Sequence, residues 1–168
     1  MKRLEQILVK AESSTFYKWV LNIILAKTIP FNKPHRLKIA SLTSNQINTR
    51  LPYIKNNKNH LNGIHACALA AQCEFTCGLV LARHFPFAKY RLIMQQLTMD
   101  YHYQGKTDTT ASFSVENDFV NALQKRLDTE DAILETFKVV AKDTNGTDIC
   151  TATVIWQLKS WDKVKTKR

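Results

Sequence analysis

The feature that most constrains the fold is an apolar stretch of small residues over positions 63–85. Alanine, cysteine, glycine and leucine dominate this stretch, and no proline interrupts it. A helix of this composition must be buried on most of its sides, and its small side chains let a neighbouring backbone approach closely. The sequence therefore predicts one central helix enclosed by a curved sheet.

The segments around this stretch show the alternation of apolar and polar residues that is typical of strands. The clearest case is 108–116, where Thr109, Ala111, Phe113 and Val115 share one face. The pair Asn145-Gly146 separates two later alternating segments and is a hairpin signal. The predicted strands cover residues 36–43, 46–53, 90–103, 108–116, 132–142 and 148–161, and a short helix covers 118–127.

An amphipathic helix is predicted before the first strand. Pro30 ends it, and its apolar stripe consists of Phe16, Trp19, Val20, Ile23 and Ile24. The apolar part, 16–31, is too short to span a bilayer and is interrupted by polar residues. We therefore expect this helix to dock on the domain through that stripe, and we expect no membrane span.

The order of the elements predicts an α+β domain, because helices and strands do not alternate as they do in a doubly wound sheet. The length of 168 residues, with 45% hydrophobic and 23% charged residues, suits one folded domain. No repeat or flexible linker divides the chain. We expect a single domain over 1–168, with an N-terminal helix over about 1–30, a core over about 36–161 and a basic C-terminal tail over 162–168.

The net charge of +10 attracts anionic partners, among which nucleic acid, a phospholipid surface and the phosphates of CoA all qualify. The cysteines Cys67, Cys73, Cys77 and Cys150 form no CxxC pair and match no zinc-binding spacing. We therefore expect no metal site. Four thiols without a secretory leader indicate a reducing, cytoplasmic environment.

One acidic residue, Glu74, lies deep in the apolar stretch. A buried, unpaired carboxylate is costly, so Glu74 is either hydrogen-bonded for structure or placed in a cleft where it reacts. The first backbone amides of the helix, including that of Ala66, have no acceptor within the helix and suit an oxyanion, unless a cap such as Asn62 binds them. Eight residues separate Ala66 from Glu74, a distance of about 12 Å along a helix. They can therefore cooperate only across a homodimer or a dimer of dimers.

The segment 59–74 resembles the loop and central helix of hotdog-fold acyl-CoA thioesterases, in the branch that includes the phenylacetate-pathway enzymes. The pattern there is an Asn, a Gly, then His-Gly-Gly, and an acidic residue nine positions after the His. Asn59, Gly63, His65 and Glu74 stand at the matching places. The resemblance implies the hotdog fold, in which a curved antiparallel sheet wraps around one long central helix.

The resemblance also implies roles for individual residues. The amide of Ala66 would polarise the thioester carbonyl, and Glu74 of the partner subunit would activate water or attack directly. Asn59 would orient the substrate or the water. His65 would have either a structural or a catalytic role.

The sequence departs from this pattern where Ala66 and Cys67 replace two glycines. Gly63 and Cys67 would then line the substrate, with Cys67 adding bulk. A non-catalytic acyl-CoA-binding or regulatory hotdog protein is the alternative function. Binding of nucleic acid rests on charge alone and is not expected. No cofactor is implied, since an acyl-CoA or acyl-carrier thioester is itself the substrate, and the acyl chain stays open.

Overall fold

The computed structural model describes residues 2–164, so residues 165–168 of the predicted basic tail lie outside the described part. The fold is α+β, as predicted. The helices are α1 (Lys2–Ser13), α2 (Thr15–Thr28), α3 (Ala66–His84) and α4 (Asn117–Thr129), with short 3-10 turns at Pro30–Asn32, Lys55–Asn57 and Trp161–Lys163. The strands are β1 (Lys38–Leu42), β2 (Gln46–Leu51), β3 (Tyr90–Tyr101), β4 (Thr109–Ser114), β5 (Ile133–Lys142) and β6 (Asp148–Ser160).

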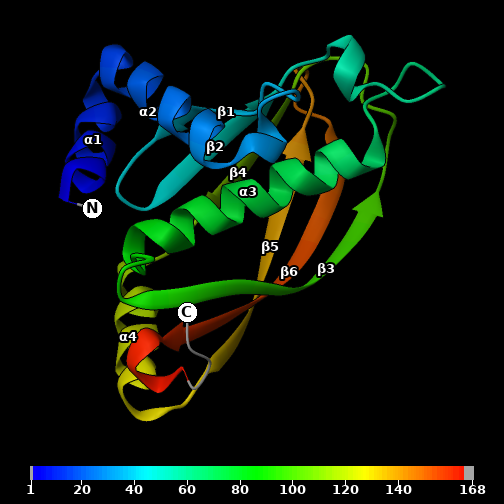
Figure 1. Ribbon diagram of the computed structural model, residues 1–168. Coiled ribbons are helices and arrows are strands. Elements are labelled where there is room, and N and C mark those ends of the chain that lie inside the picture. Colours follow the sequence, from blue (N-terminus) through cyan, green and yellow to red (C-terminus); the bar gives the residue numbers. More distant parts are fainter. Residues whose placement is uncertain (1, 165–168) are drawn as a thin grey trace.

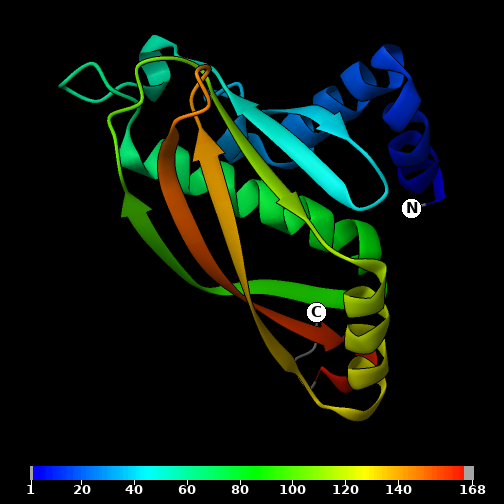
Figure 2. The ribbon, with the colours of Figure 1, turned by 180° about the vertical axis from the view of Figure 1, so that it is seen from behind.

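The six strands form one antiparallel sheet in the order β1-β2-β4-β5-β6-β3. The sheet curves around α3, and the view from behind shows its strands crossing over that helix (Figures 1 and 2). Between β5 and β6, Gly146 adopts a φ of +85°, which favours glycine, and its N–H donates to the carbonyl of Asp143. The predicted strands, the hairpin turn and the hotdog arrangement are therefore confirmed.

Helix α3 is the centre of the core, as its composition predicts. It packs against strands β2 to β6. Its buried side chains are Ala68, Leu69, Gln72, Cys73, Phe75, Thr76, Cys77, Val80 and Leu81. By length and composition alone α3 could also cross a membrane, but the core helix of a globular domain passes the same test.

A buried polar network fixes how α3 is rotated on the sheet. The amide nitrogen of Gln72 donates to the carbonyls of Thr49 on β2, at 3.2 Å, and Thr109 on β4, at 3.0 Å. The hydroxyl of Thr109 donates back to Gln72 Oε1 at 2.7 Å. Two residues along a helix turn by about 200°, so this network points Glu74 away from the sheet. Glu74 stands out in the sequence as the one acidic residue of α3, whereas no sequence signal marks Gln72.

Replacing Gln72 with leucine is expected to lower the free energy of unfolding by about 2–4 kcal/mol, because the Thr109 hydroxyl and two buried carbonyls lose their partner. Urea unfolding measures the change. The control is Gln6→Leu, at an exposed position of α1. A Gln72→Leu protein as stable as this control would mean that the network does not hold α3 in place.

The N-terminal region differs from prediction in two ways. It holds two helices rather than one, because the Ser14 side chain caps the start of α2. The docked face of α2 is also not the predicted stripe: Leu21 is buried, whereas Phe16 and Trp19 are 62% and 60% exposed. The docked side also carries apolar residues, Leu21 and Leu25, so periodicity alone selected the wrong face.

Polar residues of α2 attach it to the free edge of the sheet. The Asn22 side chain donates to the carbonyl of Ile39 at 3.1 Å and accepts from the Ile39 amide at 2.7 Å. Lys18 Nζ donates to the carbonyl of Ala40 at 2.8 Å. Asn22 thus bonds to β1 as another strand would, and α2 covers this edge.

Candidate functional site

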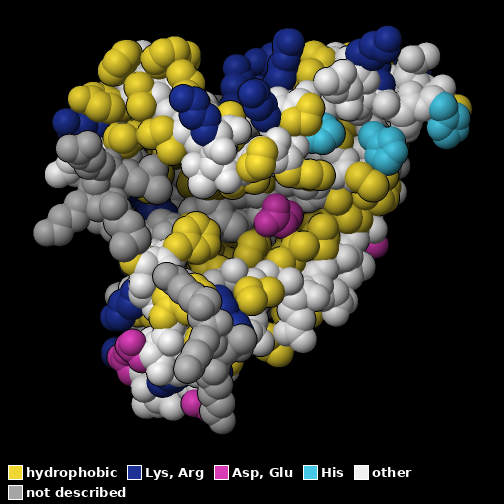
Figure 3. Space-filling view, in the orientation of Figure 1, with side chains coloured by type: hydrophobic (Ala, Val, Ile, Leu, Met, Phe, Trp, Pro, Cys, Tyr) yellow, Lys and Arg dark blue, Asp and Glu magenta, His cyan; other side chains and the backbone are white. Residues whose placement is uncertain are grey.

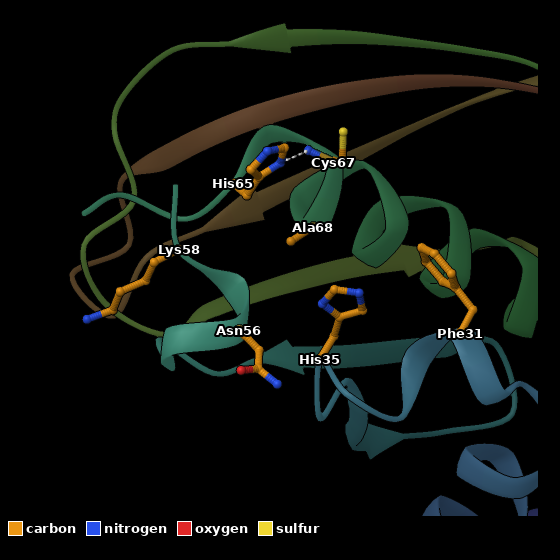
Figure 4. A pocket seen from close by; sticks show the side chains of 7 residues that line it. All are labelled: Phe31, His35, Asn56, Lys58, His65, Cys67 and Ala68. Carbon is orange, nitrogen blue, oxygen red and sulfur yellow. Dashed lines mark hydrogen bonds between the residues drawn. The ribbon is translucent and has the colours of Figure 1, made fainter. Parts of the chain in front are cut away.

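The start of α3 is capped by His65, not by Asn62. His65 has φ −64° and ψ 136°, and its Nδ1 accepts from the amide of Cys67 at 3.1 Å (Figure 4). The His65 amide donates to the carbonyl of Asn57 at 2.7 Å. Asn62 instead takes a positive φ of 59° in the preceding loop. The ring of His65 therefore has a structural role at the helix end.

Asn59 organises the loop before α3. Its Oδ1 accepts from the amides of Leu61 at 2.9 Å and Gly63 at 3.0 Å. Its Nδ2 has no partner among residues 2–164. Only the amide nitrogen of Asn59 is therefore free to meet a substrate.

Ala66 is the first residue of α3 and is exposed. Within the described part of the chain, no acceptor binds its amide N–H. Its carbonyl accepts from the hydroxyl of Tyr101 at 3.0 Å, which ties the helix start to β3. The arrangement leaves an exposed, oriented donor, as an oxyanion site requires.

Gly63 and Cys67 differ in their surroundings. Gly63 is buried, and a Cβ there would lie 2.5 Å from Cγ of Gln104, so loop packing explains this glycine. The thiol of Cys67 is free and exposed. It lines an open pocket of about 250 Å³ at the start of α3.

Figure 4 shows the other side chains around this pocket. Phe31 and His35 approach α3 from the segment after α2, and Lys58 points away, its ammonium 3.7 Å from the ring centre of Tyr53. His35 Nδ1 lies 2.8 Å from Asn57 Oδ1. His35 could not be predicted as part of this pocket, because no motif links it to residues 59–74.

Glu74 lies on the side of α3 that faces away from the sheet and is partly buried. Its carboxylate has no hydrogen-bond or ion partner among residues 2–164. Burial raises the pKa of this carboxyl above its ordinary value. The sequence left two interpretations of Glu74 open, a structural hydrogen bond or a place in a cleft. The structure shows no hydrogen-bond partner among residues 2–164 and places Glu74 in a cleft.

That cleft is a groove of about 640 Å³ bounded by α2, α3 and β3. Figure 3 shows the hollow face, where hydrophobic side chains surround a single acidic one and basic side chains gather along the upper edge. The groove is lined by Ile24, Leu25, Thr28, Ile29, Phe31, Asn32, Glu74, Phe75, Gly78, Leu79, Ala82, Phe87, Leu92, Ile93, Met94 and Trp156. Among the lining residues that the structure describes, Glu74 is the only charged one. The contribution of α2 was not predicted, because it requires knowing where α2 docks.

Within one chain the structure does not bring the candidate residues together. Ala66 and Glu74 are the first and ninth residues of the same helix, so about 12 Å separates their backbones. Cys67 and His65 line the pocket at the helix start, whereas Glu74 lines the groove further along. Phe31 lies between the two, since it lines both.

Solved structures with the same arrangement include proteins described as thioesterases. A Pseudomonas aeruginosa protein, described as of unknown function and a probable thioesterase, superposes with a TM-score of 0.78 at 20% identity, over 84% of this chain and 95% of its own. A Haemophilus influenzae thioesterase gives a TM-score of 0.67 at 9% identity, over 89% and 95% of the two chains. A Staphylococcus aureus thioesterase gives 0.63 at 13% identity, over 77% and 98%. At these identities the likeness establishes the shared hotdog-like fold.

Among curated proteins, none matches this sequence. A family match covers residues 17–158, and therefore all of α3, α2 without its first two residues and the sheet without the last two residues of β6. It includes both the groove and the loop before the central helix. The chain belongs to the family described as a domain of unknown function, DUF4442.

Proposed function

We propose that this protein is an acyl-CoA thioesterase in which Glu74 is the general base or nucleophile and the Ala66 amide stabilises the oxyanion. The observation that carries the proposal is an unpaired carboxylate of raised pKa in an apolar groove. A carboxylate whose pKa is raised is a stronger base toward the proton of a water molecule.

The spacing of two polar residues gives further support. The S. aureus thioesterase has been solved as two variants. In one, alanine replaces the glutamine at its position 32, and in the other, alanine replaces the glutamate at its position 47, fifteen residues later. Asn59 and Glu74 are separated by the same fifteen residues in this chain. Asn59, through its free Nδ2, is proposed to orient the substrate or the attacking water.

In the proposed reaction, Glu74 takes a proton from water as the water oxygen attacks the thioester carbon. The carbonyl oxygen becomes an oxyanion that accepts from the Ala66 amide. When the tetrahedral intermediate collapses, the C–S bond breaks and the proton returns to the sulfur. The products are a carboxylic acid and CoA thiol, and no further reactant is needed.

A homodimer, or a dimer of dimers, is proposed to complete the site. Strand β3 is a twelve-residue edge strand, and along it the side chains of Ile93 and Met94 are exposed next to the groove. A free, apolar strand edge is a ready partner for a second copy. Such pairing would bring the partner's helix start toward Glu74, which one chain cannot do.

A non-catalytic acyl-CoA-binding protein is the second candidate, and exposed Cys67 favours it. This side chain follows the proposed oxyanion donor directly in the chain and adds bulk to the pocket at the start of α3. Because the described cysteines are all free thiols, the cytoplasm is the proposed location for either function.

The deciding experiment is a hydrolysis assay with a panel of acyl-CoA esters, in which released thiol is measured. We expect turnover of at least one ester to exceed the background by several orders of magnitude, as is usual for enzymes. Calorimetry on the same esters measures binding independently. Binding without release of thiol from any ester would establish the binding protein instead.

A further inference from the structure

The groove beside Glu74 has the shape of a channel along one helix face. Glu74, Gly78 and Ala82 follow one another at intervals of four residues and all line it. This spacing places them in one row, which extends about 12 Å from the carboxylate. The groove is thus long in one direction, with the reactive group at one end.

Helix α2 forms the wall opposite this row. Ile24, Leu25, Thr28 and Ile29 line the groove over the last turns of α2. The helix is held in place by the bonds of Asn22 to β1 and by buried Leu21. At the far end, Arg83 of α3 forms an ion pair with Glu12 of α1. The wall is therefore part of the folded domain.

The chemistry of the lining selects the ligand. Apart from Glu74, the polar groups of the described lining residues are the side chains of Thr28 and Asn32 and the indole N–H of Trp156, and both Asn32 and Trp156 are buried. Such a surface offers little to a polar acyl group and much to hydrocarbon. With C–C bonds of about 1.5 Å at near-tetrahedral angles, an extended alkyl chain advances roughly 1.25 Å per carbon, so about ten carbons lie along the row of about 12 Å from Glu74 to Ala82. The groove of about 640 Å³ is large enough for such a chain. A short or single-ring acyl group would leave most of the groove empty.

We propose that the groove binds a straight aliphatic acyl chain of about eight to twelve carbons and that α2 sets the chain length. This inference rests on the proposed function, since it places the thioester at Glu74 and the chain along Gly78 and Ala82. Residues of α2 then determine specificity without taking part in the chemistry.

The first test measures binding of S-alkyl-CoA thioethers, which have no carbonyl to hydrolyse. Burial of each methylene contributes about 0.8 kcal/mol, so Kd should fall about fourfold per added CH₂ from butyl to decyl. Equal affinity for butyl-CoA and decyl-CoA would overturn the proposal. Length-dependent binding by a protein that hydrolyses no acyl-CoA would leave the groove assignment standing and remove the thioesterase function.

The second test narrows the groove from the α2 side. Thr28 is exposed and lines it, so Thr28→Trp should put a large ring in the channel and leave the core intact. We expect at least tenfold weaker binding of decyl-CoA and unchanged binding of butyl-CoA. Thr15→Trp, the same change on the same helix outside the groove, should alter neither.

Sedimentation of both variants shows whether the groove binds an acyl chain or forms an interface between subunits. We expect Thr28→Trp to sediment like the wild-type protein. If this substitution dissociates the assembly and weakens every chain length equally, the groove receives a second copy rather than an acyl chain, and the proposal is wrong.

Discussion

Replacing Glu74 with glutamine is expected to lower kcat at least ~100-fold, the lower range for loss of a general base. Glutamine keeps the shape of the side chain but cannot accept the proton of water. Binding of alkyl-CoA should persist, because the base acts in the transition state more than in the ground state. A variant that keeps full turnover would show that Glu74 is not the base.

The pH dependence gives this prediction a second readout. Because burial raises the pKa of Glu74, kcat of the wild-type enzyme should rise with pH as this carboxyl loses its proton, above the pH range of an ordinary glutamate. The rise should be absent from the residual activity of Glu74→Gln. A stopped or steady-state assay between pH 4 and pH 8 measures it.

As the pH rises, the stability of the wild-type protein should fall while its kcat rises. A carboxyl with a raised pKa in the folded state favours folding while it is protonated, and that contribution is lost as the pH rises through the folded-state pKa. Glu74→Gln removes this loss, so its Tm should exceed that of the wild type at pH 8 and equal it at pH 4. Asp131→Asn, at an exposed position outside the helices and strands, is the control and should change Tm at neither pH.

The strands and the central helix could be predicted because their signals are local. In β4, buried and exposed residues alternate without exception, and the small-residue content of α3 matches a helix that packs against five strands. The docked face of α2 could not be predicted, because both candidate faces carry apolar residues. What selects the face is the pairing of Asn22 with Ile39, seventeen residues away.

The candidate site was predictable only in part, for a similar reason. A lone acid in an apolar helix marks Glu74, but only the fold shows that Gln72 faces the sheet while Glu74 faces a groove. The Ala66 amide follows from the position of the helix start. The residues of α2 that close the groove come from a segment almost fifty positions earlier, and no local pattern connects them with Glu74.

Replacing Ala66 with proline is expected to lower kcat by about 100- to 1,000-fold, the usual effect of removing one oxyanion donor. Proline is favoured at the first position of a helix and removes only the N–H, which has no acceptor among residues 2–164. The extended conformation of His65 suits a residue that precedes proline. The Tm should therefore stay unchanged. Ala66→Gly keeps the amide and should keep the activity.

Mixing the two inactive variants tests whether the site is shared between subunits. In a dimer of one Glu74→Gln chain and one Ala66→Pro chain, one of the two sites receives an intact carboxylate and an intact amide. Random exchange makes half of the dimers mixed, so activity should return to about a quarter of the wild-type value. If each site is built within one chain, every site in the mixture stays defective and nothing returns. Recovery would therefore demonstrate that the two subunits each supply one of the two groups of a site, because about 12 Å separates these groups on one helix.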